Sequence, residues 1–95
     1  MKVTSVNVTL ANQGKLRAYA EIVIDDGLAI HGLRIIEGDH GLFISMPSKT
    51  KPDGTFTDIV HPINRQTREL IEQSVLAEYQ RVVGKAISAV PSRQA

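Results

Sequence analysis

Two stretches near the N-terminus alternate apolar and polar residues, and this alternation constrains the fold more than any other feature of the sequence. Residues 2–10 place valine or leucine at positions 6, 8 and 10, and residues 15–25 alternate similarly through leucine, alanine and isoleucine. A period of two is typical of strands with one buried face. Between them, Asn12 and Gly14 tolerate the positive φ of a turn. The sequence therefore predicts an antiparallel hairpin over residues 2–25.

A third strand is expected over residues 28–35, after the tight-turn signal of Asp-Asp-Gly at 25–27. Its apolar residues fall at positions 28, 30, 33 and 35, so the alternation skips at His31 and Gly32. A glycine inside a strand pattern often indicates a bulge. We expect a bulge here, because it would return the later apolar residues to the inner face.

The middle of the chain combines strand and turn signals. Its pattern predicts a short strand over residues 42–46 that Pro47 closes, and a Pro-Asp-Gly turn within residues 51–54. Another strand is expected over residues 55–61. The alternation does not decide which face of this last strand is buried.

Asn64 is expected to cap a long C-terminal helix, because its side-chain oxygen can accept from the unpaired N–H groups of a first helical turn. Apolar residues then recur at helical spacing. They are Ile71, Val75, Leu76, Tyr79, Val82, Val83 and Ala86. The helix could end at Gly84 or continue toward Pro91. Residues 91–95 are expected to form a frayed tail.

These elements predict a single α+β domain over residues 1–90, with one antiparallel sheet of about five strands and one long C-terminal helix packed on one face. A chain of 95 residues with 42% hydrophobic content supports one core and no second domain. One helix covers only part of such a sheet. We therefore expect a homodimer formed through a sheet edge or the second face.

Charge and residue usage narrow the function classes. Eleven basic residues against ten acidic ones give a net charge of +1, so any positive patch must be local. Cysteine is absent, no apolar signal segment follows Met1, and no apolar run approaches the roughly 20 residues of a membrane span. A cytoplasmic protein is expected. The four aromatic residues are scattered, which argues against a base-stacking platform.

No pattern in the sequence indicates an enzyme. His31, His40 and His61 lie apart without metal-ligand spacing. The aspartates at positions 25, 26 and 39 fall in turns, where Asp bonds the local backbone. Neither a G-x-S-x-G elbow nor a phosphate-binding glycine loop is present. We expect no catalytic residue, cofactor, metal or small-molecule substrate, with a small enzyme around the histidines as a residual alternative.

Four cations are the candidate nucleic-acid contacts. Lys49 and Lys51 lie in a loop expected to project from the sheet, where they are either phosphate contacts or solubilising charges. Arg65 and Arg68 fall in the first helical turn, where the macrodipole disfavours cations. An anion bound at the helix N-terminus would explain them. A salt bridge from Arg68 to Glu72 is the simpler explanation, and we favour it for Arg68.

Four motifs are specific in combination. They are M-K-V-T-x-V at the N-terminus, G-L-F-I-S-M-P-S-K, P-D-G-x-F-x-D-I and H-P-I-N-x-x-T-R-x-x-I. Together they resemble the stage V sporulation protein G family, SpoVG, from Met1 to about Tyr79. The resemblance implies a small homodimeric bacterial protein that binds DNA, and in some members RNA. It implies regulation of gene expression in sporulation, septation, cell division or virulence, without enzymatic activity or cofactor.

The basic loop departs from the family's common S-K-R-T-P-D-G-E-F-R-D. Thr50 and Thr57 stand where arginines are frequent, and Lys51 stands where the family usually has threonine. Lys49 carries over as a nucleic-acid contact, while Lys51 restores a charge without the bidentate reach of arginine. Fewer phosphate contacts predict modest, weakly sequence-specific binding with a shallow salt dependence. A module that binds a protein partner through an exposed sheet edge is the alternative function.

Overall fold

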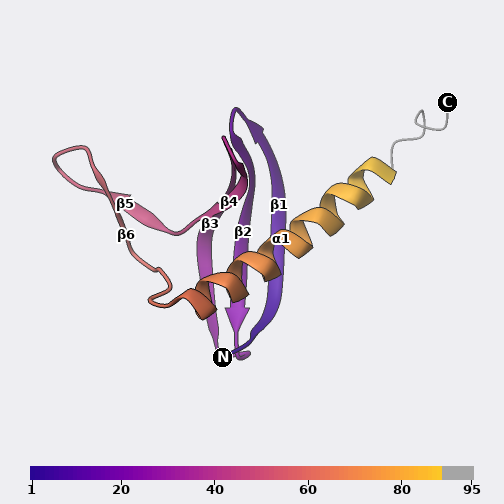
Figure 1. Ribbon diagram of the computed structural model, residues 1–95, viewed down its shortest axis with the longest axis horizontal. Helices are drawn as coiled ribbons and strands as arrows, with labels where there is room; N and C mark the ends of the chain where they lie inside the picture. The colour runs from indigo at the N-terminus through magenta and orange to yellow at the C-terminus, as the bar shows by residue number, and fades with distance from the viewer. Residues whose placement is uncertain (89–95) are drawn as a thin grey trace.

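The computed structural model describes residues 1–88, and residues 89–95, which include the expected tail, lie outside the described residues. Two antiparallel sheets and one helix make up the described part (Figure 1). The elements are β1 Val3–Gln13, β2 Leu16–Ile24, β3 Leu28–Gly38, β4 Gly41–Ser45, β5 Ser48–Thr50, β6 Phe56–Asp58 and α1 Arg65–Ser88. The larger sheet has the order β1-β2-β3-β4, and β5 pairs with β6 alone. The predicted α+β class is confirmed.

The first three strands follow one another as antiparallel neighbours, joined by tight turns. In the turn from β2 to β3, the Gly27 N–H donates to the Ile24 carbonyl at 2.9 Å. Asp25 and Asp26 have φ angles of 52° and 54°, and a type I′ β-turn requires such positive values at its two central residues. The start of the chain closes on this turn, because the Lys2 N–H donates to Asp25 Oδ1 at 2.8 Å. The predicted tight turn is confirmed, with its positive φ angles on the aspartates.

The predicted bulge in the third strand is also confirmed. Glu21 of β2 opposes both His31 and Gly32 of β3, because the register shifts between Ala20 and Ile22. Gly32 has a φ of 86°, a conformation that glycine adopts without the steric cost of a Cβ. The bulge keeps the apolar residues on both sides of it on the inner face.

The helix α1 packs across one face of the four-stranded sheet (Figure 1). Asn64 caps it as predicted, because its Oδ1 accepts from the Thr67 N–H at 2.8 Å. The buried core residues are Val8, Ala18, Ala20, Ile22, Leu33, Ile35 and Ile44 from the strands, Met46 just after β4, and Ile71 and Val75 from α1. The helix continues through Gly84 to Ser88, so the structure selects continuation over an end at Gly84.

Other residues of the predicted apolar stripe extend this packing. Leu76, Tyr79 and Val82 are partly buried against the core, and Val83 is half-buried. The side chain of Ala86 lies outside the described residues. Within residues 1–88, no helix is long and apolar enough to cross a membrane.

The strand expected over residues 55–61 lies apart from the main sheet. It is shorter, Phe56–Asp58, and pairs with β5 so that Ser48 faces Asp58. Pro47 cannot donate a backbone hydrogen bond to extend the β4 ladder, and its carbonyl accepts instead from the Ile59 N–H at 2.7 Å. The chain therefore folds back on itself as a separate hairpin, at the left in Figure 1. The expected sheet of about five strands is a four-stranded sheet plus this two-stranded hairpin.

Candidate nucleic-acid interface

The turn at the tip of the β5–β6 hairpin has the predicted Pro-Asp-Gly geometry. The Gly54 N–H donates to the Lys51 carbonyl at 3.0 Å, and the Lys51 N–H donates to the Thr55 carbonyl at 2.7 Å. Asp53 Oδ1 accepts from the Thr55 hydroxyl at 2.6 Å and from the Thr55 N–H at 3.0 Å. These bonds lower the pKa of Asp53, the hydroxyl contributing most. The carboxylate is therefore held by the turn itself.

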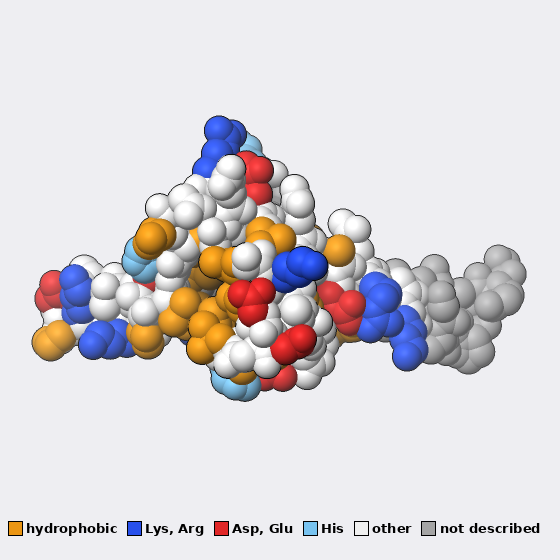
Figure 2. Space-filling view, turned by 90° about the horizontal axis from the view of Figure 1, so that it is seen from below, with side chains coloured by type: hydrophobic (Ala, Val, Ile, Leu, Met, Phe, Trp, Pro, Cys, Tyr) orange, Lys and Arg blue, Asp and Glu red, His pale blue; other side chains and the backbone are white. Residues whose placement is uncertain are grey.

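Lys49 and Lys51 lie on the same part of this hairpin. Lys49 is on β5 opposite Thr57, and Lys51 begins the turn. Both are exposed and line one open groove of the hairpin. Figure 2 shows basic side chains on this projecting part of the molecule, beside hydrophobic and acidic ones. The structure thus brings the two predicted lysines into one surface.

The charge of the hairpin is balanced. Residues 48–58 contain two lysines and two aspartates, Asp53 and Asp58, so their formal charges sum to zero. Asp58 also lines the groove that holds the lysines. An attractive field for a polyanion is therefore confined to the lysine ends, because the opposite charges partly cancel at longer range.

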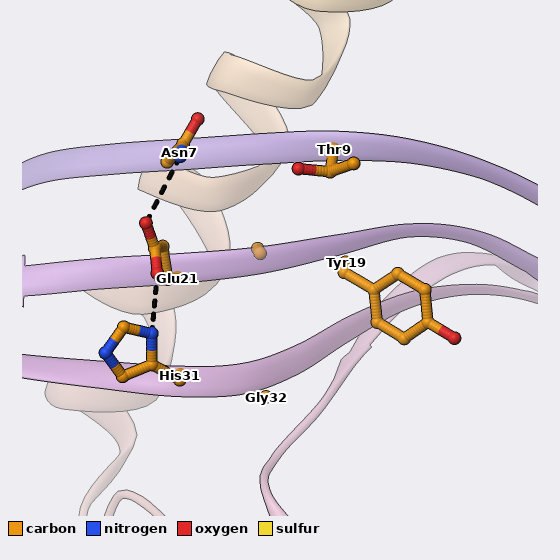
Figure 3. A pocket seen from close by; sticks show the side chains of 7 residues that line it. Asn7, Thr9, Tyr19, Glu21, His31 and Gly32 are labelled. Carbon is orange, nitrogen blue, oxygen red and sulfur yellow. Dashed lines mark hydrogen bonds and ion pairs between the residues drawn. The ribbon is translucent and has the colours of Figure 1, made fainter.

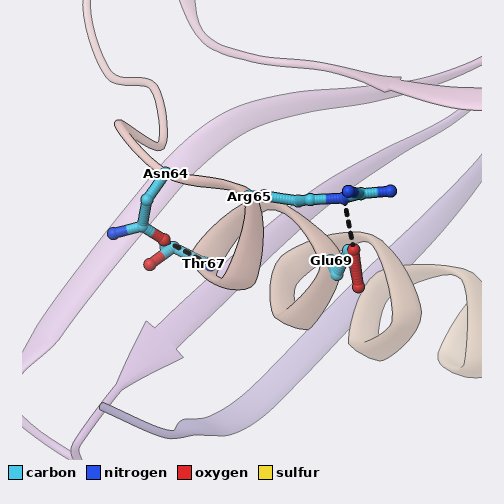
Figure 4. A network of polar contacts seen from close by, with 4 residues as sticks. All are labelled: Asn64, Arg65, Thr67 and Glu69. Atoms are coloured by element: carbon cyan, nitrogen blue, oxygen red, sulfur yellow. Dashed lines mark hydrogen bonds and ion pairs between the residues drawn. The ribbon is translucent and has the colours of Figure 1, made fainter.

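Arg65 and Arg68 lie in the first turn of α1, which contains no acidic residue. Arg65 Nε lies 3.1 Å from Glu69 Oε1 (Figure 4). The favoured salt bridge from Arg68 to Glu72 is wrong, because no carboxylate in the described residues lies within 4.0 Å of the Arg68 guanidinium. Both pairs have the i,i+4 spacing that allows contact, so spacing could not distinguish them.

The four predicted cations do not form one cluster. The hairpin that carries Lys49 and Lys51 extends away from the first turn of α1, where Arg65 and Arg68 begin the helix (Figure 1). Residues 59–64 join the two parts and contain no lysine or arginine. The lysine groove and the arginine turn are therefore two separate basic surfaces of one subunit.

The histidines also lie apart from one another. His31 Nδ1 donates to Glu21 Oε2 at 2.6 Å, and His61 Nδ1 lies 3.2 Å from the Pro62 carbonyl. His40 is exposed in the turn between β3 and β4. Among the described residues, no group of three or more His, Cys, Asp or Glu could hold a metal ion.

A further surface, with exposed aromatic side chains, lies on the sheet face opposite α1, and it was not predicted as a site. Tyr19 and Phe43 are both exposed, with 43% and 46% of their surface accessible. Each alternates along its strand with residues of the buried core, Ala18 and Ala20 for Tyr19, and Ile44 for Phe43. The alternation contained this signal, because residues between core positions must share the other face of a strand. Tyr19 and Phe43 are far apart along the chain, so the alternation alone could not show that they share one surface.

The fold defines a small α+β protein in which one helix covers one face of a four-stranded antiparallel sheet and a hairpin with two exposed lysines projects beside it. The family model of SpoVG matches residues 1–81. The chain belongs to the SpoVG family, as its motifs indicated.

Curated relatives span nearly the whole chain. A protein of Anaeromyxobacter sp. (strain Fw109-5) is 46% identical over 92 residues, 97% of this chain and 95% of its own length. One from Oceanobacillus iheyensis is 50% identical over 82 residues, 85% of each chain. One from Phytoplasma australiense is 43% identical over 95 residues, 99% of each chain. All three carry the name "Putative septation protein SpoVG".

Proposed function

We propose that this chain is a homodimeric, nucleic-acid-binding regulator of gene expression that acts in septation or sporulation. The observation that supports binding is the open groove of the β5–β6 hairpin, where Lys49 and Lys51 are both exposed. Exposed ammonium groups can neutralise phosphates at low desolvation cost. The name of the relatives supports the cellular process, and a cytoplasmic location suits such a regulator. We infer a role in binding and not in catalysis.

Each subunit should bind weakly by itself. The two lysines of the groove are offset by Asp53 and Asp58 of the same hairpin. The arginines of the α1 first turn add a separate basic surface, in which Arg65 is already paired with Glu69. We therefore propose DNA as the main ligand, and RNA as a second, with the lysines as principal contacts and the arginines as auxiliary ones.

Exposed apolar side chains support the homodimer. Phe56, on β6 of the hairpin, is 71% exposed, and Ile59 and Ile63, between the hairpin and the start of α1, are 62% and 86% exposed. Figure 2 shows hydrophobic side chains continuing from the projecting hairpin to the centre of the molecule. An exposed apolar surface of this kind is typical of a protein interface. A second copy would cover it and would present two lysine grooves to one nucleic acid, which raises avidity.

A titration of labelled duplex DNA tests the lysine groove. We expect the Lys49→Ala/Lys51→Ala variant to bind more weakly than the wild type at two salt concentrations. Four lysine contacts in a dimer predict a slope of log K against log salt of roughly −3 to −4, and the variant should lose most of it. Lys15→Ala is the matched control, because Lys15 is an exposed lysine in the β1–β2 turn, outside the β5–β6 hairpin.

Equal binding by the double variant and the wild type would contradict the lysine groove as the site. Sedimentation equilibrium tests the dimer separately, and a monomer at micromolar concentration would contradict it. The second candidate function is a protein-interaction module, favoured by the same exposed Phe56, Ile59 and Ile63. It would replace the first if the wild type bound neither DNA nor RNA.

A further inference from the structure

The sheet face opposite α1 contains a shallow hollow of about 230 Å³ (Figure 3). Three neighbouring strands, β1, β2 and β3, contribute its walls. The lining residues are Asn7, Thr9, Tyr19, Ala20, Glu21, His31 and Gly32. Figure 3 shows the ring of Tyr19 on one side of the hollow and the side chains of Glu21 and His31 on the other. The hollow therefore combines an aromatic surface with hydrogen-bonding groups.

The carboxylate of Glu21 is fixed from both sides. Asn7 Nδ2 donates to Glu21 Oε1 at 3.2 Å, and His31 Nδ1 donates to Glu21 Oε2 at 2.6 Å. The hydrogen bond from Asn7, with a smaller contribution from His31, lowers the pKa of Glu21. An ionised carboxylate has about four lone-pair positions. Two of these are occupied here, so the group can still accept hydrogen bonds from a ligand.

The bulge of β3 contributes two residues, His31 and Gly32, to the lining of the hollow. Gly32 lines it and carries no side chain, at a position where the positive φ of 86° suits glycine. Its Cβ, if present, would lie 3.7 Å from the nearest side-chain atom, in Pro47. Gly32 therefore contributes only backbone atoms to the lining of the hollow.

A row of residues extends from the hollow across the sheet and adds a stacking surface. Thr9, Tyr19, Arg34 and Ser45 are successive cross-strand partners from β1 to β4. Arg34 is exposed, and no carboxylate of the described residues lies within 4.0 Å of its guanidinium. Phe43 follows on β4, opposite Ile36. Aromatic rings and arginine planes are the groups on which unstacked bases pack in single-stranded nucleic-acid sites.

We propose that this face binds a single-stranded segment of nucleic acid, with one base stacked on Tyr19 and its amino group hydrogen-bonded to Glu21. The inference rests on the proposed nucleic-acid function and adds a second site to it. Adenine, cytosine and guanine carry an exocyclic amino group that donates to a carboxylate, whereas uracil and thymine carry carbonyl acceptors there. Glu21 therefore selects amino-bearing bases over uracil.

Single strands suit this face better than a duplex or a second copy of the chain. A duplex keeps its bases stacked, so it cannot place one on Tyr19. A second copy would have to desolvate the charges of Arg17, Glu21 and Arg34. Phe56 and Ile63, at 71% and 86% the more exposed apolar side chains, lie elsewhere on the molecule, on the β5–β6 hairpin and just before α1.

Fluorescence anisotropy with labelled ribo-oligonucleotides of eight cytidines or eight uridines tests the site in the full chain. The wild type should prefer the cytidine oligomer by about 5- to 150-fold, the range of one base-specific hydrogen-bonding contact. Tyr19→Leu keeps an apolar side chain but loses the stack, so it should bind the cytidine oligomer about 5- to 150-fold more weakly. Glu21→Gln keeps the shape but can donate to uracil, so the preference should largely disappear.

The lysine variant separates this proposal from the proposed function. Lys49→Ala/Lys51→Ala should bind duplex DNA weakly yet keep the preference for cytidine. Unchanged oligomer binding by Tyr19→Leu and Glu21→Gln, with duplex binding still dependent on the lysines, would overturn the sheet-face site alone. Conversion of Tyr19→Leu to a monomer would also overturn it, because the face would then be a dimer contact. Absence of all nucleic-acid binding in the wild type would overturn both proposals.

Discussion

Glu21 on β2 and His31 on β3 lie 2.6 Å apart, from Oε2 to Nδ1, across the bulge that interrupts the third strand. Without the bulge, the alternation of β3 would bring a different pair of side chains together, because each shift by one residue exchanges the two faces of a strand. The same extra residue that keeps Leu33 in the core therefore also sets His31 beside the carboxylate. Packing on one face and polar contacts on the other depend on one local irregularity.

The hydrogen bonds to Glu21 should make stability depend on pH. Because the folded state lowers the pKa of Glu21, its contribution is present above the unfolded-state value of about 4.3. It is lost as the pH falls through the lower folded-state value. We expect Glu21→Gln to be less stable than the wild type at neutral pH, with the difference disappearing in acid. Urea unfolding at a series of pH values measures this.

Asn7→Ala provides the companion variant for that pH series. It removes the largest cause of the lowered pKa while leaving the carboxylate in place. Its stability should fall less steeply than that of the wild type as the solution is acidified. If the stability of the wild type and of both variants changed with pH in parallel, the hydrogen bonds to Glu21 would contribute nothing to folding.

Gly32→Ala should destabilise the fold by about 1–2 kcal/mol, the cost of a left-handed conformation for a residue with a Cβ. The cost should come from the backbone and not from a clash, because the added Cβ would meet its nearest neighbour at 3.7 Å. Gly84→Ala is the matched control. It lies inside α1 with open space around a Cβ, so it should stabilise by up to about 1 kcal/mol. Urea midpoints that shift in the same direction for both variants would contradict this assignment.

Asn64→Ala should cost about 1 kcal/mol, because it removes the acceptor for the Thr67 N–H at the start of α1. Asn64→Asp should retain the cap and gain a favourable charge at the helix N-terminus. Thermal or urea unfolding followed by circular dichroism distinguishes them. Equal losses in the two variants would indicate that the amide nitrogen, and not Oδ1, is the important atom.

A double-mutant cycle should detect coupling between Arg65 and Glu69, on the order of 0.3 kcal/mol or less for an exposed i,i+4 pair. The same cycle on Arg68 and Glu72 should give no measurable coupling. Low salt is the condition to use, because screening weakens exposed pairs. Coupling between Arg68 and Glu72 alone would mean that the salt bridge expected from the sequence forms in place of the one between Arg65 and Glu69.

The local elements could be predicted closely from the residues alone. The hairpin over residues 2–25 follows from alternation, and the bulge at His31 and Gly32 follows from one skipped position. The Asn64 cap follows from side-chain chemistry in a single turn. Each of these elements depends on interactions between residues that are close along the chain or directly paired, so residue type and spacing are enough to predict it.

The arrangement of the candidate sites depended on the tertiary structure. Strand β6 was expected in the main sheet and pairs with β5, and Arg65 is ion-paired instead of Arg68. Tyr19 and Phe43 are far apart along the chain, yet the strand order places both on the open face. Alternation and spacing specify which residues share a face, but several partners satisfy the same pattern. Long-range pairing and packing select among them, because only the folded chain excludes the alternatives.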